Sequence, residues 1–477
     1  MKTSRLLYAI FLAGFCVSGA RAQAPLPVQL VGESSKVCQL TGETDWKSGQ
    51  PTEARTKTNG GLTNVDLGYP LEHAGKLIFL FGDSWPPDHP KGSAPEVPPD
   101  DGVGSTKFPG PPSAKECLKM ALHRNSDGNF IRPTVGPAPG IKQGFFNVPS
   151  GGISVNDKLF AFFWTNHCGK PTPLLPRPNA PLKAPGPSTN CVEASELNSL
   201  GIGELAWSAD GGNTYTNVGP MPTGFVYSSA VNVAGIGGLP PSAGIVVLGA
   251  ARYRSSIPYL AYAHPKTFSD ISKWHFFTGL DAEGQPQWVS YSDWTKGSGG
   301  SGTDWKPPGQ AEMFAASSNA DRCVGEHSLT WNAPLQRWLL VYNCKNDIVA
   351  RIASAPWGPW SAPTVLISNN TPGIRCNLVM DAGGCPGQEN DWPQPTPTTF
   401  VPGGFYAPFV LDRYTVNGPA GSGFAQAITY WLVSTWNPYQ VIVMKSILRD
   451  VQERRPPLPI PHLPLPPGEG PVKIPPK

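Results

Sequence analysis

Short apolar runs recur along this 477-residue chain, and turn-forming residues bound each of them. Brief runs that alternate or stay apolar throughout are typical of β-strands, and we expect no amphipathic helix longer than two turns. The runs form five strand-rich units. In chain order the units contain Leu77–Phe81; Leu159–Trp164 and Glu204–Trp207; Phe225–Val233, Gly244–Ala250 and Pro258–Tyr262; Glu326–Trp331, Trp338–Tyr342 and Ile348–Ala353; and Phe405–Leu411, Ile428–Ser434 and Val441–Ile447.

Each unit is too small to bury both faces of its own sheet. Stacking the five units around a common axis would cover those faces, so the pattern favours an all-β, radially stacked fold. A two-sheet sandwich is the alternative, although a sandwich is usually smaller than this chain.

The first 22 residues have the form of a signal peptide. Lys2 and Arg5 make a positive start, Leu6–Ala20 is a short apolar run, and Ala20-Arg21-Ala22 is a small-x-small cleavage site. No later segment is apolar for long enough to be a membrane helix. We therefore expect a secreted or periplasmic protein that is not inserted in a membrane.

The rest of the chain divides by composition. We expect an N-terminal extension over residues 23–36, one folded domain over 37–450 and a disordered, Pro-rich tail over 451–477. Two Pro/Gly-rich insertions, Pro86–Pro112 and Lys170–Ser188, interrupt the domain. Each follows a strand end, so they either shape the rim of a site or decorate the surface.

Composition supports a loop-rich, exported β protein. Only 15% of residues are charged, while glycine (53), proline (56) and tryptophan (15) are abundant. The net charge of +3 comes without any basic run interleaved with aromatic residues, so we expect no nucleic-acid partner. We expect the protein to be a monomer.

Eight of the nine cysteines lie beyond the signal peptide, since Cys16 falls within it. An even number in an exported protein favours four disulfides, although eight cysteines allow 105 pairings. No Cys-x-x-Cys pair occurs, so we expect no metal site and no cofactor. Proximity in the sequence favours the pairs Cys168–Cys191, Cys323–Cys344 and Cys376–Cys385, which leaves Cys38–Cys117.

Two aspartates flank the first apolar strand. Asp66 lies before the strand Leu77–Phe81, and Asp83 lies where the strand ends, next to Trp85. A carboxylate at the end of a buried strand costs desolvation energy unless it is paired or takes part in chemistry. Two carboxyl groups with an aromatic platform are what a glycoside hydrolase needs. The alternative is that Asp83 caps a turn.

The segment Ser208-Ala209-Asp210-Gly211-Gly212-Asn213-Thr214-Tyr215 resembles the Asp-box of sialidase-like propellers. In such a box the aspartate folds back on a hairpin turn and the aromatic residue packs beneath it. We therefore assign Asp210 to the fold and not to catalysis.

Five further signatures resemble, in the right order, those of domain-of-unknown-function family 4185. The similarity runs from about Val37 to Leu448 and omits the two insertions. The signatures are Thr63-Asn64-Val65-Asp66-Leu67-Gly68 with Phe81-Gly82-Asp83-Ser84-Trp85, Pro149-Ser150-Gly151-Gly152-Ile153-Ser154, Gly325-Glu326-His327-Ser328-Leu329-Thr330-Trp331-Asn332, Gly358-Pro359-Trp360-Ser361 and Trp436-Asn437-Pro438-Tyr439.

This resemblance implies a five-bladed β-propeller. It also implies membership of glycoside hydrolase family 183, whose enzymes cleave D-arabinofuranose polymers such as mycobacterial arabinogalactan and lipoarabinomannan in an endo fashion. The two catalytic aspartates of that family fall by motif on Asp66 and Asp83. The two long insertions and the extra cysteines depart from the family's pattern.

Other candidate site residues come from the same segments. Glu326 is a candidate third acid that orients substrate or shifts a pKa; alternatively it is a buried acid paired with Arg322 or His327. The remaining candidates for substrate binding are Trp85, Trp164 and Trp436 as sugar platforms, Tyr439 as a hydroxyl donor, and His167, His327, Arg252 and Asn147 as polar contacts. For each of these, a structural role in a blade or a turn is the alternative.

The sequence thus favours an exported glycosidase that cleaves a furanoside polysaccharide, most specifically D-arabinan, with Asp66 and Asp83 as acid and base. A non-catalytic carbohydrate-binding or cell-surface propeller is the alternative.

Overall fold

The structure is a computed structural model that describes residues 24–86, 100–135, 147–165, 202–250, 254, 256–297, 307–309, 313–314, 322–389, 401–420 and 423–452. The expected signal peptide, the insertion Lys170–Ser188 and the tail beyond residue 452 lie outside these ranges. Residues 87–99 of the insertion Pro86–Pro112 also lie outside them, whereas Asp100–Thr106 of that insertion form a strand.

The strands of the described residues form five sheets. Blade 1 holds β3 (Asn64–His73), β4 (Lys76–Trp85), β5 (Asp100–Thr106) and β6 (Ala121–Leu122); blade 2 holds β8 (Asn147–Val155), β9 (Lys158–Thr165), β10 (Ile202–Ser208), β11 (Thr214–Pro220) and β7 (Thr134–Val135). Blade 3 holds β12 (Tyr227–Asn232), β13 (Ile245–Ala250), β14 (Pro258–Ala263), β15 (His275–Leu280) and β16 (Pro286–Ser290); blade 4 holds β17 (Val324–Asn332), β18 (Arg337–Cys344), β19 (Asp347–Ala353) and β20 (Thr364–Ser368). Blade 5 holds β21 (Gly404–Val410), β22 (Val416–Asn417), β23 (Ala425–Trp436) and β24 (Gln440–Asp450), with β1 (Gln29–Leu30) and β2 (Ser35–Gln39). The short helices α1 (Thr56–Gly60) and α3 (Tyr291–Trp294) lie in connections.

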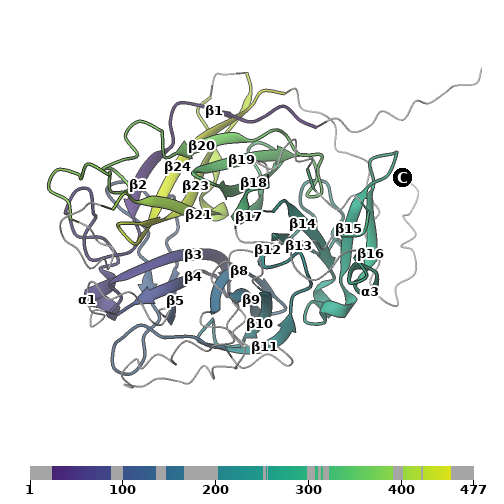
Figure 1. Ribbon diagram of the computed structural model, residues 1–477, viewed down its shortest axis with the longest axis horizontal. Helices are drawn as coiled ribbons and strands as arrows, with labels where there is room; N and C mark the ends of the chain where they lie inside the picture. Colours follow the sequence, from purple (N-terminus) through teal and green to yellow (C-terminus); the bar gives the residue numbers. More distant parts are fainter. Residues whose placement is uncertain are drawn as a thin grey trace, which may run out of the picture.

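The five sheets surround a common axis. Strands β3, β8, β12, β17 and β21 each contact the next in this order, and β21 contacts β3 to close the circle. Figure 1 shows these five strands nearest the centre of the ring. The fold is a five-bladed β-propeller, as the sequence predicted, and not a two-sheet sandwich.

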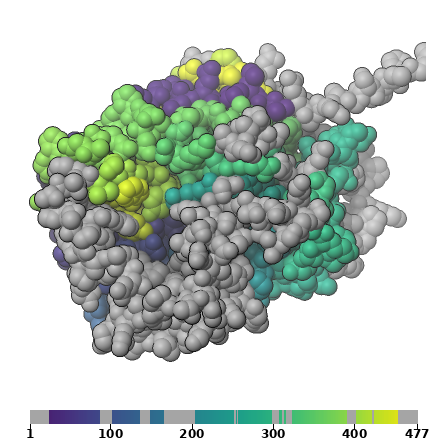
Figure 2. Space-filling model, in the orientation of Figure 1, coloured from purple at the N-terminus to yellow at the C-terminus, as the bar shows by residue number. Residues whose placement is uncertain are grey.

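The N-terminal strands complete the last blade. Strand β1 pairs with β24 through Gln29 and Leu30, and β2 pairs with the same strand from Ser35 to Gln39. Figure 2 shows the purple N-terminal residues beside the yellow C-terminal ones. The expected start of the domain at residue 37 was therefore too late. The edge of β24 needs hydrogen-bond partners, and the segment that precedes blade 1 supplies them.

The core lies between neighbouring blades. In strand β4, every residue of the run Leu77–Phe81 is buried, because both faces of blade 1 pack against other side chains. Burial on both faces explains why the strands of this chain appear in the sequence as short continuous apolar runs instead of strict alternations.

The Asp-box segment forms the hairpin between β10 and β11. Asp210 Oδ1 accepts hydrogen bonds of 3.0 Å from the backbone N–H groups of Asn213 and Thr214, and the Tyr215 ring is buried beneath. The network holds the turn, which agrees with the structural role that the sequence indicated for Asp210.

Disulfides join Cys323 to Cys344 and Cys376 to Cys385, as sequence proximity predicted, and Cys38 to Cys117, the pair that these assignments left. Cys168 and Cys191 lie outside the described residues. Disulfides are typical of extracellular or periplasmic proteins. Among the helices that the structure describes, none has both the length and the apolar character needed to cross a membrane.

Candidate active site

Three innermost strands bring polar side chains to the same end of the propeller axis. Asp66, Glu326 and Tyr406 are each the third residue of their strand, in β3, β17 and β21. The Tyr406 hydroxyl donates to Asp66 Oδ2 over 2.6 Å, and the charge of Glu326 acts on Asp66. The first residues of these strands therefore lie around one point.

Strand irregularities coincide with these residues. The register of β3 against β4 shifts between Asn64 and Asp66, that of β17 against β18 between Val324 and His327, and that of β21 against β23 between Tyr406 and Phe409. A bulge bends its strand and re-aims a side chain, and bulges are over-represented next to active sites.

Asp66 is buried, with only 6% of its surface exposed. Its Oδ2 atom accepts a second hydrogen bond, 2.7 Å long, from the hydroxyl of Tyr439. Tyr439 lies in the turn between β23 and β24, and its carbonyl accepts from the N–H of Val65 in β3. Among the described residues, the other carboxyl oxygen, Oδ1, has no hydrogen-bond partner.

Asp83 lies beside Asp66 but is partly exposed. Its Oδ2 atom is 3.1 Å from the same Tyr439 hydroxyl. Its backbone has a φ of +33°, and the pairing of β4 with β5 shifts between Phe81 and Ser84. Positive φ is uncommon for a residue other than glycine, and it clusters at functional sites.

Gly82 allows the two acids to come this close. A Cβ atom at this position would lie 2.6 Å from Val148 Cγ1, 2.7 Å from Leu67 Cδ1 and 2.9 Å from Asp66 Oδ1. Any side chain at position 82 would therefore displace Asp66 or open the packing between β3, β4 and β8.

The expected positions of the two acids along the strands were wrong in detail. Asp66 lies inside β3 and not ahead of the first strand, and Asp83 lies inside β4 and not at its end. Strands β3 and β4 both extend through irregular pairings beyond the part that pairs with the apolar run Leu77–Phe81. Asp66 and Asp83 therefore lie within strands, at positions that the apolar pattern of the sequence assigned to connections.

Burial dominates the electrostatics of the pair. It raises the pKa of Asp66 to about 8, assisted by the negative charges of Asp83 and Glu326 and opposed by the hydrogen bonds from Tyr406 and Tyr439. Burial also raises the pKa of Asp83, to about 6, against the hydrogen bond from Tyr439. Two carboxyl groups with separated, raised pKa values are suited to acid and base roles.

Glu326 is the third acid of the site, and its partner is Arg254. The guanidinium donates to both carboxylate oxygens, over 2.8 Å and 3.2 Å, and lies 4.8 Å from the centre of the Tyr406 ring. The sequence had suggested Arg322 or His327 as the partner. His327 is instead fully buried, and its ring nitrogens lie 2.9 Å and 3.3 Å from the carbonyl oxygens of Gly325 and Leu248.

The tryptophan candidates lie in different environments. Trp85 is only 6% exposed, so it is packed in the interior and presents no open face to a sugar. Trp164 is half-buried with its ring 5.1 Å from that of Tyr227, and Trp436 is half-buried against Gly404. Of the other candidates, His167 and Arg252 lie outside the described residues, and Asn147 is described only as the first residue of β8.

Sequence reasoning missed two residues of the site, Tyr406 and Arg254. Tyr406 precedes Ala407 and Pro408 in a strand, where proline marks an irregular pairing. Arg254 follows the apolar strand β13 two residues after Arg252, the position that the sequence favoured. The sequence does not show which residue either one contacts, because each contact joins two different blades, with 340 positions between Tyr406 and Asp66 and 72 between Arg254 and Glu326.

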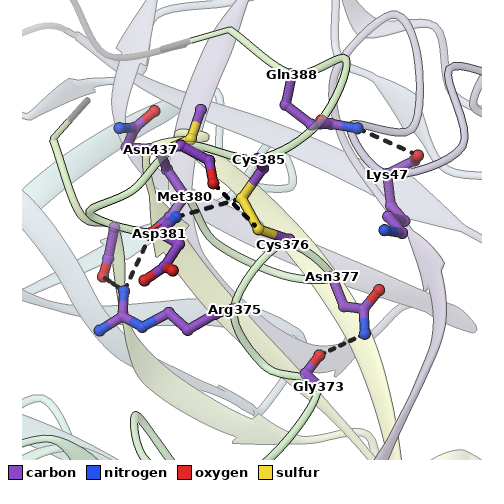
Figure 3. The surroundings of a disulfide bond; sticks show 12 residues. Lys47, Gly373, Arg375, Cys376, Asn377, Met380, Asp381, Cys385, Gln388 and Asn437 are labelled. Atoms are coloured by element: carbon purple, nitrogen blue, oxygen red, sulfur yellow. Dashed lines mark hydrogen bonds between the residues drawn. A yellow bond between two sulfur atoms is a disulfide. The ribbon is translucent and has the colours of Figure 1, made fainter. Parts of the chain in front are cut away.

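A disulfide-closed loop supports the turn that carries Tyr439. The Met380 N–H donates to the carbonyl of Asn437 over 2.8 Å, and Figure 3 shows this contact beside the Cys376–Cys385 bond. Arg375 Nη1 in turn donates to the Met380 carbonyl over 3.1 Å. The loop thus braces the chain two residues before Tyr439. Within the described ranges, no group of three or more His, Cys, Asp or Glu residues could hold a metal ion.

Comparison with known proteins gives one family. The model of a family described as a domain of unknown function, DUF4185, matches residues 198–445. No curated protein matches the sequence.

Solved structures resemble the chain only distantly. A protein from Bacteroides ovatus, provisionally assigned to the hydrolases, is 10% identical with a TM-score of 0.47, covering 82% of this chain and 87% of that one. The GH43_1 enzyme from Xanthomonas citri complexed with xylose is 9% identical with a TM-score of 0.35, covering 83% and 91%. An endo-arabinase from Bacteroides thetaiotaomicron is 10% identical with a TM-score of 0.29, covering 81% and 95%. Likenesses this distant do not identify an activity.

Proposed function

This chain belongs to the DUF4185 family, and we propose that it is a glycoside hydrolase that cleaves a furanoside polysaccharide with Asp66 and Asp83. The observation that carries the proposal is the pairing of these two acids through the hydroxyl of Tyr439 at the propeller axis. Glycosidases commonly use two carboxyl groups, one to protonate the leaving oxygen and one as base or nucleophile.

Exposure distinguishes the two acids. Asp83 is partly exposed, so it is the carboxyl that meets the glycosidic oxygen first. Asp66 lies deeper, under the two tyrosine hydroxyls, and its higher pKa keeps a proton in the site at neutral pH. The negative charge of Glu326, which is held by Arg254, also favours the protonated form of Asp66.

The spacing of the acids favours retention of configuration. The two contacts to Tyr439, 2.7 Å and 3.1 Å long, add to 5.8 Å, which is the largest possible separation of the two Oδ2 atoms. Retaining glycosidases place their carboxyl groups about 5–5.5 Å apart, whereas inverting enzymes need roughly 6.5–9.5 Å to admit a water molecule.

The substrate assignment rests on the sequence resemblance. The signatures that contain Asp66, Asp83, Glu326 and Tyr439 resemble those of endo-acting D-arabinanases, so D-arabinan is the substrate that we propose. Trp164 and Trp436, which are half-buried, are the tryptophans that we propose as sugar platforms. Asn147, His167 and Arg252 are proposed polar contacts. We further propose that the protein is secreted through the signal peptide over residues 1–22 and acts as a monomer.

The test is incubation of the purified protein with a panel of polysaccharides that includes D-arabinan, L-arabinan, arabinogalactan and xylan. We expect shortening of D-arabinan to a ladder of oligosaccharides, which indicates endo cleavage. Proton NMR should show that the first product formed has the same anomeric configuration as the substrate. Absence of products from every polymer would refute the proposal, and the opposite anomer would refute retention.

One observation favours a second candidate, a non-catalytic carbohydrate-binding propeller. Both oxygens of Asp66 are covered in the structure, since Oδ1 is buried and Oδ2 lies under Tyr406 and Tyr439. Binding of an oligosaccharide, measured calorimetrically, without product after prolonged incubation would favour this candidate.

A further inference from the structure

The oxygens of Asp66, Asp83, Tyr406 and Tyr439 make more contacts than their hydroxyl protons can serve. Three contacts are 2.6 Å, 2.7 Å and 3.1 Å long, all within hydrogen-bond range. Each tyrosine hydroxyl carries one proton, so the two hydroxyls can donate in only two of the three contacts. A full hydrogen bond in the third contact needs a proton from a carboxyl group.

Tyr439 is the centre of this arrangement. Its hydroxyl touches Oδ2 of both aspartates, whereas the Tyr406 hydroxyl touches Oδ2 of Asp66 and interacts with Tyr439 itself. The Tyr439 side chain is 4% exposed, and the turn around it is held by hydrogen bonds from Met380 to Asn437 and from Val65 to Tyr439 itself. The position of the hydroxyl between the two carboxyl groups is thus fixed by the fold.

We propose that Tyr439 is a proton relay through which Asp66 and Asp83 share a single proton. In one arrangement Asp66 is protonated and donates to the Tyr439 oxygen, while the Tyr439 hydroxyl donates to ionised Asp83. Transfer breaks the Asp66 O–H and Tyr439 O–H bonds and forms a new Tyr439 O–H bond and an Asp83 O–H bond. The net charge of the three groups stays at minus one throughout.

The surroundings favour this one-proton state. The other charged groups facing the pair, within the described residues, are Glu326 and its partner Arg254, which form an ion pair. The negative charges of Asp83 and Glu326 oppose ionisation of Asp66. Through the relay, the proton of Asp66 passes to the partly exposed Asp83, which presents it to a substrate. Asp66 is then left as the carboxylate, the form that a glycosidase needs as base or nucleophile. The inference deepens the proposed function and rests on it for its kinetic test.

The kinetic test compares Tyr439→Phe with Tyr406→Phe, since each variant removes one buried hydroxyl from the same Asp66 oxygen. Tyr439→Phe removes the hydroxyl that connects the two acids and stabilises their one-proton state. The pH range over which this state predominates should therefore narrow, and the acid and alkaline limbs of the kcat/KM profile should approach each other by about one pH unit or more. In Tyr406→Phe, Asp66 loses one donor but Tyr439 still bridges the two acids, so the alkaline limb should move to higher pH. If Tyr439 were a simple donor to both acids, both limbs of Tyr439→Phe would move to higher pH together, and that result would overturn the proposal.

A second test needs neither activity nor a folded variant. Asp66 and Asp83 can be followed by carboxyl-13C NMR in the wild-type protein across its titration. With a shared proton, both signals should move in both titration steps. If each signal moves in one step only, the proton is localised and the relay is refuted. Loss of activity on every polysaccharide together with shared titration would refute the proposed function while leaving the relay intact.

Discussion

At the scale of single residues, the candidate site places two carboxyl groups where ionisation is unfavourable. Two carboxyl groups lie side by side, Asp66 buried and Asp83 partly exposed, and desolvation raises the pKa of both above their ordinary values. A buried carboxylate costs free energy that an isosteric amide does not. The two acids therefore lower the stability of the folded protein, and this cost increases with pH.

The sign of that pH dependence follows from proton linkage. For an acid whose pKa is higher in the folded state, the folded state binds the proton more tightly. The contribution of this proton to the free energy of unfolding is complete below the ordinary pKa near 3.8. It is lost as the pH rises through the pKa of the folded state, which is about 8 for Asp66 and about 6 for Asp83.

We therefore predict that Asp66→Asn gains stability relative to the wild type as the pH rises from 4 to 8. Thermal unfolding measured across this range should show the gain, and Asp83→Asn should show a smaller one that is complete at lower pH. Asp157→Asn, at the exposed turn between β8 and β9, is the matched control for loss of one carboxylate. A difference between Asp66→Asn and the wild type that does not change with pH would contradict the account.

The sequence identified part of this site. Asp66, Asp83, Glu326 and Tyr439 all lie near the axis. The sequence could name them as candidates because each lies in one of the recognised signatures. Tyr406 and Arg254 could not be found in this way. Tyr406 is 340 positions from the Asp66 that it contacts, and only closure of the ring brings the two together. Trp85 and His327 were candidates for substrate contact with a structural role as the alternative, and both are buried.

At the scale of strands and loops, the close approach of neighbouring blades is set by glycine. Gly151 in β8 faces blade 3 so closely that a Cβ atom would lie 2.0 Å from the carbonyl oxygen of Ser228 and 2.9 Å from Ser229 Cα. These are backbone atoms, so a side chain could be admitted only if two blades moved apart.

Gly151→Ala should therefore destabilise the protein by about 1–3 kcal/mol or more. Chemical denaturation measures the effect. Gly110→Ala is the control, because its Cβ atom would meet nothing within 4 Å and its φ is not positive. Equal stability of the two variants would contradict the packing described between β8 and β12.

The disulfide loop beside Tyr439 should matter for activity beyond its effect on stability. The double variant Cys376→Ser/Cys385→Ser opens a loop with a sequence separation of 9, which costs roughly 2.5 kcal/mol in the loop-entropy model. It also loosens the Met380 contact that holds the Tyr439 turn, so activity should fall at temperatures where the protein is folded.

The control is Cys38→Ser/Cys117→Ser. It opens a separation of 79, which costs roughly 4.5 kcal/mol, but it lies at the junction of β2 with blade 1. We expect a larger loss of thermal stability and no loss of activity in the folded state. Activity that falls in proportion to stability in both variants would count against a role for the Cys376–Cys385 loop in positioning Tyr439.

At the scale of the whole molecule, the ring is closed by strands from both ends of the folded region. Strands β1 and β2 cover the edge of β24, so blade 5 contains residues separated by about the full length of the propeller. The five strand-rich units predicted the number of blades. The closure could not be predicted, because β1 and β2 are too short and too polar to stand out as strands.

Deletion of residues 1–39, which removes β1 and β2, should expose the edge of β24 and destabilise the protein strongly. We expect a lower unfolding temperature and a greater tendency to associate through the open edge. Differential scanning calorimetry with light scattering tests both. Deletion of residues 1–23, which leaves β1 and β2 in place, is the control. An unchanged unfolding temperature after the longer deletion would refute the closure.

The central claim is that Asp66 and Asp83 together cleave a furanoside polysaccharide. The most direct measurement is the initial rate of reducing-end release from D-arabinan by the wild type, Asp66→Asn and Asp83→Asn, each with its unfolding temperature recorded. The account predicts release by the wild type and rates lower by about 100- to 10,000-fold in both variants, with folding intact. Wild-type rates in either folded variant, or no release by the wild type, would contradict it.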